Sequence, residues 1–198
     1  MMKNATRVLL AVLILAGAAA GQESAGGLKA GPMLCIPGSQ ESSSIYNPSN
    51  LLSFRFGVFY VRKISDVLTV QPEIHLALKG SEYYSAVTRH DETARFNYLE
   101  FPLLVNARIA GEVFELFAGP YAALLLSHTP IDAQHDWTGL GNDLDTFDVG
   151  GCLGARVWLG DVSLEVQFEQ GLSNVLPFGN RSHYNMTLSF QVGYRLFK

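Results

Sequence analysis

The stretch that decides the fold is Leu68–Lys79, which reads LTVQPEIHLALK. Its residues alternate strictly between two faces. One face carries Leu68, Val70, Pro72, Ile74, Leu76 and Leu78, and the other carries Thr69, Gln71, Glu73, His75, Ala77 and Lys79. A period of two residues is typical of a β-strand that has one apolar and one polar face. This stretch therefore predicts a strand that separates two chemically different environments.

The same alternation returns along the chain, so we expect eight strands and no helix. It is clear in Tyr98–Ile109, Val162–Glu169 and Asn185–Leu196. Weaker versions cover Leu28–Ile36, Leu52–Arg62, Val113–Ser127 and Phe147–Leu159. The fold class predicted from these patterns is all-β.

The connections between the expected strands alternate in length. Tight turns are expected at Lys63-Ile64-Ser65, Gly111-Glu112 and Gly160-Asp161. Long polar loops are expected at residues 37–50, 80–94, 128–146 and 174–183. Short turns at one rim, long loops at the other and an even strand number indicate an eight-stranded antiparallel up-and-down transmembrane β-barrel of the outer-membrane type. Both termini would then lie on the short-turn, periplasmic side.

Composition favours a membrane barrel over the alternative, a soluble barrel of the lipocalin kind. Charged residues make up 16% of the chain, below the roughly 25% of an average soluble domain, while hydrophobic residues make up 48%. The polar strand faces carry Gly, Ser and Gln and few Lys, whereas a surface exposed to water is rich in Lys and Glu. A net charge of -4 gives no electrostatic footprint for nucleic acid, so nucleic-acid partners are not expected.

The N-terminus has the layout of a secretory signal peptide. Lys3 and Arg7 precede the apolar run Val8–Ala16, and small residues follow up to Ala20. The run is too short for a membrane-spanning helix, and Ala18 stands where a lipoprotein would need its lipidated Cys. We therefore expect residues 1–20 to be a signal peptide and residues 21–198 to form the barrel domain, integral to a bacterial outer membrane.

Five short motifs follow one another in order from the third strand to the end of the chain. They are Gln71-Pro72-Glu73, Lys79-Gly80, Tyr98-Leu99-Glu100-Phe101-Pro102-Leu103-Leu104, Ala118-Gly119-Pro120-Tyr121 and Gly193-Tyr194-Arg195. With them, the stretch from Leu28 to Lys198 resembles the PorT-type, porin-family outer-membrane β-barrel domain. The resemblance implies an outer-membrane location and, for most members, no known catalysis. A few relatives are implicated in protein secretion.

The polar strand faces predict a charged barrel interior. An eight-stranded barrel is just wide enough to be filled by side chains, so inward charges must pair with one another instead of lining an open pore. An acid/base catalytic pair would need a cleft open to substrate, and we expect none. The predicted inward charges are Arg55, Glu73, His75, Lys79, Glu100, Arg108, Glu115, Asp148, Arg156, Glu165, Glu169 and Arg195.

Turn lengths predict which of these charges face one another. A two-residue turn at Gly111-Glu112 places Arg108 opposite Glu115, and a two-residue turn at Gly160-Asp161 places Arg156 opposite Glu165. A three-residue turn at Lys63-Ile64-Ser65 places Arg55 opposite Glu73. Three hairpins would thus each bring an Arg against a Glu, with Cβ atoms about 4.5–5.5 Å apart.

Other candidate sites are weaker. His90, His128, His135 and His183 fall in the expected loops, with Asp132 and Asp136 near two of them, but their spacing fits no metal motif. Ser182-His183 lies at the outer rim, where barrel lipid hydrolases keep a Ser/His/acid set. Cys35 and Cys152 lie on strands that are not neighbours, so we expect two free thiols.

The sequence therefore predicts a non-enzymatic barrel with no cofactor and no metal. Its expected partners are outer-membrane lipid, the barrel-assembly machinery and, through the four long loops, other envelope proteins or extracellular ligands. Two alternatives stay open, namely a rim enzyme that acts on lipid and a narrow porin for small solutes.

Overall fold

The structure, a computed structural model, describes residues 24–37, 46–85, 90–109, 111, 113–129, 146–173 and 184–198. The predicted signal peptide lies outside these residues. The part of the chain so described folds into strands alone, with no helix long and apolar enough to cross a membrane. The strands are β1 (Ser24–Pro37), β2 (Tyr46–Ser49), β3 (Leu51–Lys63), β4 (Leu68–Ser85), β5 (His90–Arg108), β6 (Phe114–Thr129), β7 (Phe147–Leu159), β8 (Val162–Gly171) and β9 (Asn185–Phe197).

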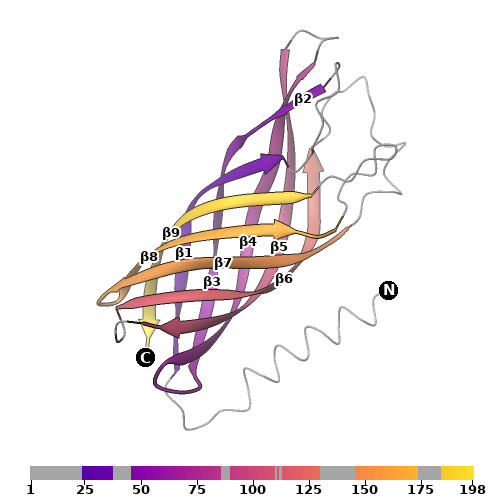
Figure 1. The fold of residues 1–198 in the computed structure, drawn as a ribbon. Coiled ribbons are helices and arrows are strands. Elements are labelled where there is room, and N and C mark those ends of the chain that lie inside the picture. Colours follow the sequence, from indigo (N-terminus) through magenta and orange to yellow (C-terminus); the bar gives the residue numbers. More distant parts are fainter. Residues whose placement is uncertain are drawn as a thin grey trace.

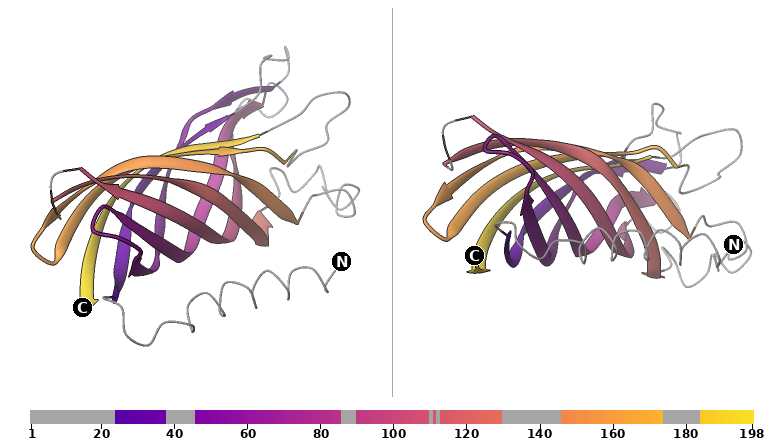
Figure 2. Two further views of the ribbon diagram at one scale, coloured as in Figure 1. Left: turned by 60° about the horizontal axis from the view of Figure 1, so that its bottom comes forward. Right: turned by 90° about the horizontal axis from the view of Figure 1, so that it is seen from below.

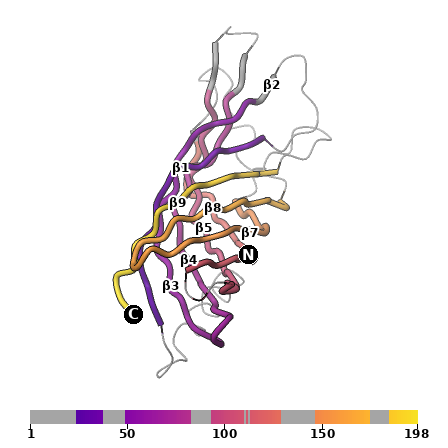
Figure 3. The backbone as a smooth tube through the Cα atoms, turned by 60° about the vertical axis from the view of Figure 1, so that its left-hand side comes forward, coloured from indigo at the N-terminus to yellow at the C-terminus, as the bar shows by residue number. Residues whose placement is uncertain are grey.

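The strands form one closed antiparallel barrel. β1 pairs with β3, each strand from β3 onward pairs with the next along the chain, and β9 pairs with β1 to close the ring, as the yellow and indigo strands of Figure 3 show. Only Asn50 separates β2 from β3, and both pair with β4, so together they make one wall position. The barrel therefore has eight positions around its wall, which confirms the predicted fold class.

The polar strand face lines the interior and the apolar face covers the outside. In β4, Gln71, Glu73 and His75 are buried, whereas Ile74 between them is exposed. The outer wall presents large apolar side chains along every long strand, among them Phe54, Phe56, Val105, Leu153, Leu164 and Phe190. This polarity is the reverse of a soluble barrel and suits a wall that contacts lipid.

The short turns gather at one end of the barrel, together with the C-terminus (Figures 1 and 2). Gly111 and Gly160 occupy two of these turns with φ angles of 62° and 69°, in the left-handed region that tight hairpin turns require. Residues 38–45, 86–89, 130–145 and 174–183 lie outside the described residues, so the predicted loops 37–50, 80–94 and 128–146 are described in part and the predicted loop 174–183 is not described.

Two predicted loops are shorter than expected. The segment 80–94 is largely strand, because β4 continues to Ser85 and pairs with β5 from His90 onward. Likewise β2 occupies part of the segment 37–50. The polar composition of these segments suggested loops. Strands that extend beyond the barrel wall are polar on both faces, however, so the alternating pattern is lost there.

The hairpin registers are confirmed at two turns and wrong at the third. Arg108 stands opposite Glu115, and Arg156 opposite Glu165, as predicted. Arg55 stands opposite Ala77 and not opposite Glu73. The turn explains the difference. Lys63 faces Thr69, so the hairpin is centred on Asp66 and not on Ile64, and each residue of β3 faces a residue four positions further along β4 than predicted.

Candidate functional site in the barrel interior

The interior is filled by charged and amide side chains contributed by nearly every strand. Arg55, Glu73, His75, Glu100, Glu115, Arg156, Glu165 and Glu169 of the predicted set are buried, as are Lys79 and Asp148. Arg108 and Arg195 are only partly buried, because they lie close to the short-turn end. We call the buried charges together the lumen network.

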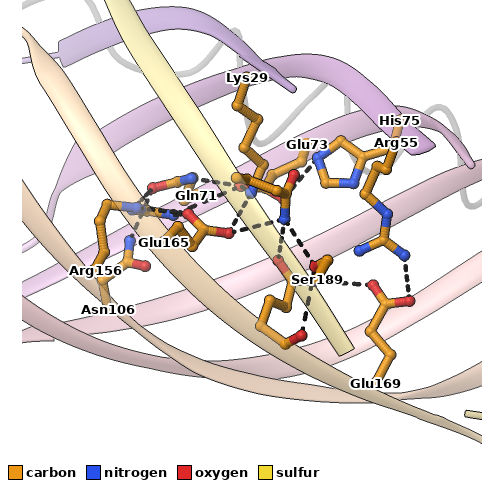
Figure 4. Close-up of polar contacts among 12 residues, drawn as sticks. Lys29, Arg55, Gln71, Glu73, His75, Asn106, Arg156, Glu165, Glu169 and Ser189 are labelled. Atoms are coloured by element: carbon orange, nitrogen blue, oxygen red, sulfur yellow. Dashed lines mark hydrogen bonds and ion pairs between the residues drawn. The ribbon is translucent and has the colours of Figure 1, made fainter. Parts of the chain in front are cut away.

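Its central part joins five charges from five strands, and Figure 4 labels four of them, Lys29, Glu73, Arg156 and Glu165. Lys29 Nζ of β1 lies 2.7 Å from Glu73 Oε1 of β4 and 2.8 Å from Glu165 Oε1 of β8. Arg156 of β7 contacts Glu165 through Nε at 2.7 Å and through Nη2 at 2.5 Å. The Arg156 guanidinium also reaches Glu115 Oε2 at 3.2 Å. The two Lys29 contacts join strands that are not neighbours in the wall, whereas Glu165 and Glu115 are the register partners of Arg156 on the adjacent strands β8 and β6.

A second part lies nearer the long-loop end. Arg55 Nη2 contacts Glu169 of β8 and lies 2.9 Å from Glu100 Oε2 of β5. Lys79 Nζ lies 2.6 Å from Glu100 Oε1 and stands 4.8 Å from the centre of the Tyr121 ring. Each cation is therefore shared between two acceptors, the arrangement that a buried charge needs in order to be retained.

His75 and Asp148 complete the network at its edges. His75 Nε2 lies 3.0 Å from Glu73 Oε2, in the view of Figure 4. Asp148 Oδ2 accepts hydrogen bonds from Tyr121 Oη at 3.2 Å and from Asn185 Nδ2 at 3.0 Å. His75 thus contacts a polar partner on its own strand, β4, whereas Asp148 contacts partners on β6 and β9.

Aromatic rings close the interior at the short-turn end. Phe59 and Trp158 meet edge to face with ring centres 6.1 Å apart. The Arg195 guanidinium lies over the Trp158 ring at 4.1 Å, and Trp158 Nε1 donates a hydrogen bond to Glu115 Oε2 at 3.0 Å. An aromatic layer therefore separates the central charges from this mouth of the barrel.

Amide side chains fill the space between the charges. Gln71 accepts a hydrogen bond from Arg156 Nη1 at 2.7 Å. Gln191 donates to Glu165 Oε1 at 3.3 Å and to Gln167 Oε1 at 3.3 Å. These groups are uncharged and lay outside the predicted site, although each falls on the inward face of its strand.

Lys29 is the main residue that sequence reasoning missed. The alternation of β1 is weak, because Gly31 and Pro32 interrupt it. The signal was present nonetheless, since Lys29 shares the face of Met33 and Cys35, both of which are buried.

The arrangement balances charge across the lumen. Four cations and six acids are buried among the described residues, and Arg108 and Arg195 bring the cations to six. Wall-to-wall ion pairs of this kind hold side chains in the centre of the barrel. Chemically they form a plug, because each acid is engaged with a cation or a hydrogen-bond donor.

The remaining candidates are not joined into a site. Cys35 and Cys152 are free thiols, both buried, on β1 and β7. His128 is exposed on β6, while Asp132, His135, Asp136, Ser182 and His183 lie outside the described residues. Where side chains are described, no three of His, Cys, Asp or Glu are grouped as a metal site would require.

A protein-family model matches most of the chain. Residues 18–176 match the outer membrane protein beta-barrel domain. The chain belongs to this family. It is therefore an integral outer-membrane β-barrel protein, in agreement with the apolar outer wall and the closed ring of strands. None of the curated proteins with which the sequence was compared matches it.

Solved structures of outer-membrane barrels share the fold. Ail, the attachment invasion locus protein of Yersinia pestis, has a TM-score of 0.51 at 12% identity, covering 88% of this chain and 99% of its own. OprG of Pseudomonas aeruginosa has a TM-score of 0.51 at 10% identity, covering 89% and 98%. Neisserial surface protein A has a TM-score of 0.52 at 9% identity, covering 87% and 99%. At these identities the likeness concerns the barrel fold alone.

Proposed function

We propose that this family member is a closed, non-enzymatic barrel that acts through the surface at its long-loop end. The lumen network carries the proposal. Arg55 and Lys79 bridge acids on β5 and β8, and Lys29 bridges acids on β4 and β8, so side chains occupy the path that a solute would take. With the lumen filled, the long-loop rim is the surface left for recognition, and loops on a rigid scaffold are where binding residues concentrate.

The proposal includes the orientation and the type of barrel. The short turns and the C-terminus face the periplasm, because short periplasmic turns and long external loops are the rule for such barrels. Within the family, motifs such as Gln71-Pro72-Glu73 and Ala118-Gly119-Pro120-Tyr121 favour a PorT-type member, and with it a role linked to protein secretion.

Solute uptake by reconstituted vesicles tests the closed lumen. The purified protein is reconstituted into phospholipid vesicles, and swelling is followed in isotonic arabinose. We expect no swelling above that of empty vesicles. The matched variant, Arg55→Ala combined with Glu169→Ala, removes two side chains that meet in the lumen and should raise the swelling rate. Swelling by the unaltered protein in proportion to its amount would support the narrow porin instead.

A lipid measurement tests the absence of enzymatic activity. Outer-membrane lipids are compared between cells that carry the unaltered protein and cells that carry Ser182→Ala with His183→Ala. The proposal predicts the same acyl-chain composition in both. A difference in acyl-chain composition that depends on these two residues would establish the rim enzyme.

A further inference from the structure

The outer wall carries an apolar groove where β9, β1, β3, β4 and β5 lie side by side. Its volume is about 520 Å³. Two rows of outward residues border it. The first runs from Tyr194 through Leu28 to Val58, and the second runs from Ala30 through Phe56 to Leu99. The groove thus runs across the strands and not along them.

A small residue creates the groove. Ala30 stands between Val192 and Phe56, its register partners on β9 and β3, and its methyl group leaves a gap between these larger side chains. Gly57 lies on the inward face of its strand, where a Cβ atom would meet the His75 side chain, so it contributes only backbone to the groove. Lys29 and His75 also line the groove, but their side chains are buried in the lumen, so only their backbone reaches the outer face. The floor is therefore backbone and the walls are hydrocarbon.

The path of the groove follows the depth of one membrane leaflet. Tyr194 pairs with Val162, the first residue after the turn at Gly160-Asp161, so this end lies at the short-turn rim. Leu99 lies at the middle of β5. Four strand spacings of about 4.8 Å give a length of roughly 19 Å. One leaflet of the hydrocarbon core is about 15 Å thick, so a slanting chain of leaflet length fits the groove.

The rim end offers groups that suit a lipid head. Tyr194 is half exposed there, and tyrosine is a usual residue at the boundary between lipid and water. Lys198 lies at the same end of the barrel, with its side chain largely exposed and its Nζ 2.8 Å from Asp161 Oδ1.

We infer that the groove holds one acyl chain of a glycerophospholipid whose head lies at the short-turn rim. This is the periplasmic leaflet in the orientation proposed above, but the inference does not depend on a closed lumen. The hydrophobic effect does not drive the binding, because the bilayer is as apolar as the groove. The chain is held because it restores van der Waals contacts that a gap in the wall would lose. The groove therefore keeps one lipid bound and selects it by the shape of its acyl chain.

Native mass spectrometry of the full chain, released from detergent micelles that contain phosphatidylglycerol, tests the inference. Ala30→Phe fills the groove without touching the lumen. Ala118→Phe, at an exposed outward position on β6, is the matched control because it adds the same ring elsewhere on the outer wall. We expect one retained lipid in the unaltered protein and in the control. In Ala30→Phe we expect about fivefold less of the lipid-bound form, because the acyl chain loses its packing contacts with the groove.

Heat-modifiable gel mobility shows whether each variant is folded, and Val192→Phe, which narrows the groove from β9, serves as a second test. Equal lipid retention in the groove variants and in Ala118→Phe would overturn the inference. So would an unaltered protein that retains no lipid. A dimer that Ala30→Phe dissociates would show that a second copy of the chain, and not a lipid, occupies the groove.

Discussion

Arg156 is held by groups from three other strands. It contacts Glu165 on β8, Glu115 on β6 and Gln71 on β4, and its side chain is almost completely buried. A guanidinium in such a site can neither lose its proton nor reach water. The barrel therefore folds only with these partners in place around the guanidinium.

We expect Arg156→Met to lower the free energy of unfolding by about 3–5 kcal/mol, because it leaves Glu165 and Glu115 buried without their cation. Urea unfolding of the protein in phospholipid vesicles measures the change. Lys63→Met is the control, since Lys63 pairs at 3.2 Å with the exposed Asp66 and should cost less than about 1 kcal/mol. Equal losses in the two variants would mean that the interior charges are solvated.

Gly154 shows how closely the interior is packed. It lies opposite Phe117, and a Cβ atom there would stand 2.2 Å from the Val166 carbonyl oxygen and 2.4 Å from the Phe117 ring. Gly154→Ala should therefore cost about 1–3 kcal/mol through overpacking. The control is Gly151→Ala on the same strand, where a Cβ atom meets nothing within 4 Å. Thermal unfolding of both variants checks the difference, and a tolerated Gly154→Ala would contradict the tight packing.

Among the elements, the hairpins show what sequence can and cannot predict. Strand faces follow from alternation, and the registers of β5 with β6 and β7 with β8 follow from two-residue turns. The register of β3 with β4 did not follow, because Ile64, Ser65 and Asp66 carry no signal that shows whether the hairpin is centred on Ile64 or on Asp66. The structure centres it on Asp66, and Ser65 Oγ accepts a hydrogen bond from Leu68 N at 3.1 Å within this turn.

The connection between β6 and β7 should be dispensable for folding. The paired part of this hairpin ends where Leu124 faces Phe147 and Leu125 N donates to Thr146 O at 2.8 Å. Replacing residues 132–143 with a Gly-Ser linker of about four residues keeps these contacts and changes the closure entropy only slightly. We expect unchanged heat-modifiable mobility on gels. Loss of the barrel would show that this segment is structural and not a carrier of recognition.

The turn between β7 and β8 contains a carboxyl group outside the barrel wall. The hydrogen bond and charge of Lys198 hold the pKa of Asp161 below its usual value, with a smaller contribution from Arg195. Because the pKa of Asp161 is lower in the folded protein than in the unfolded chain, the contact stabilises the C-terminus at pH values above the pKa of the unfolded chain. This stabilisation is lost as the pH falls through the pKa of Asp161 in the folded protein. Deleting Lys198 should raise the pKa of Asp161, as a carboxyl-carbon NMR titration would show. An unchanged titration would rule out the contact.

At the scale of the whole molecule, the closed ring determines which charges meet. Lys29 and Glu165, or Arg55 and Glu169, belong to strands that are not adjacent, so their contacts depend on the tilt and stagger of the closed sheet. Sequence alternation places each of them on the inner face. Alternation does not show which of these inward side chains meet across the lumen, because the distances between them are set only when β9 pairs with β1 and the barrel closes.

A double-mutant cycle on Arg55 and Glu169 tests the central claim most directly, namely that ion pairs between separate walls plug the lumen. The free energies of unfolding of Arg55→Met, Glu169→Gln and the double variant are measured in phospholipid vesicles. Because these side chains touch across the lumen from β3 and β8, we predict a coupling of about 1–3 kcal/mol. Additive effects, with a coupling below about 0.5 kcal/mol, would mean that the two walls do not interact and would contradict the plugged barrel.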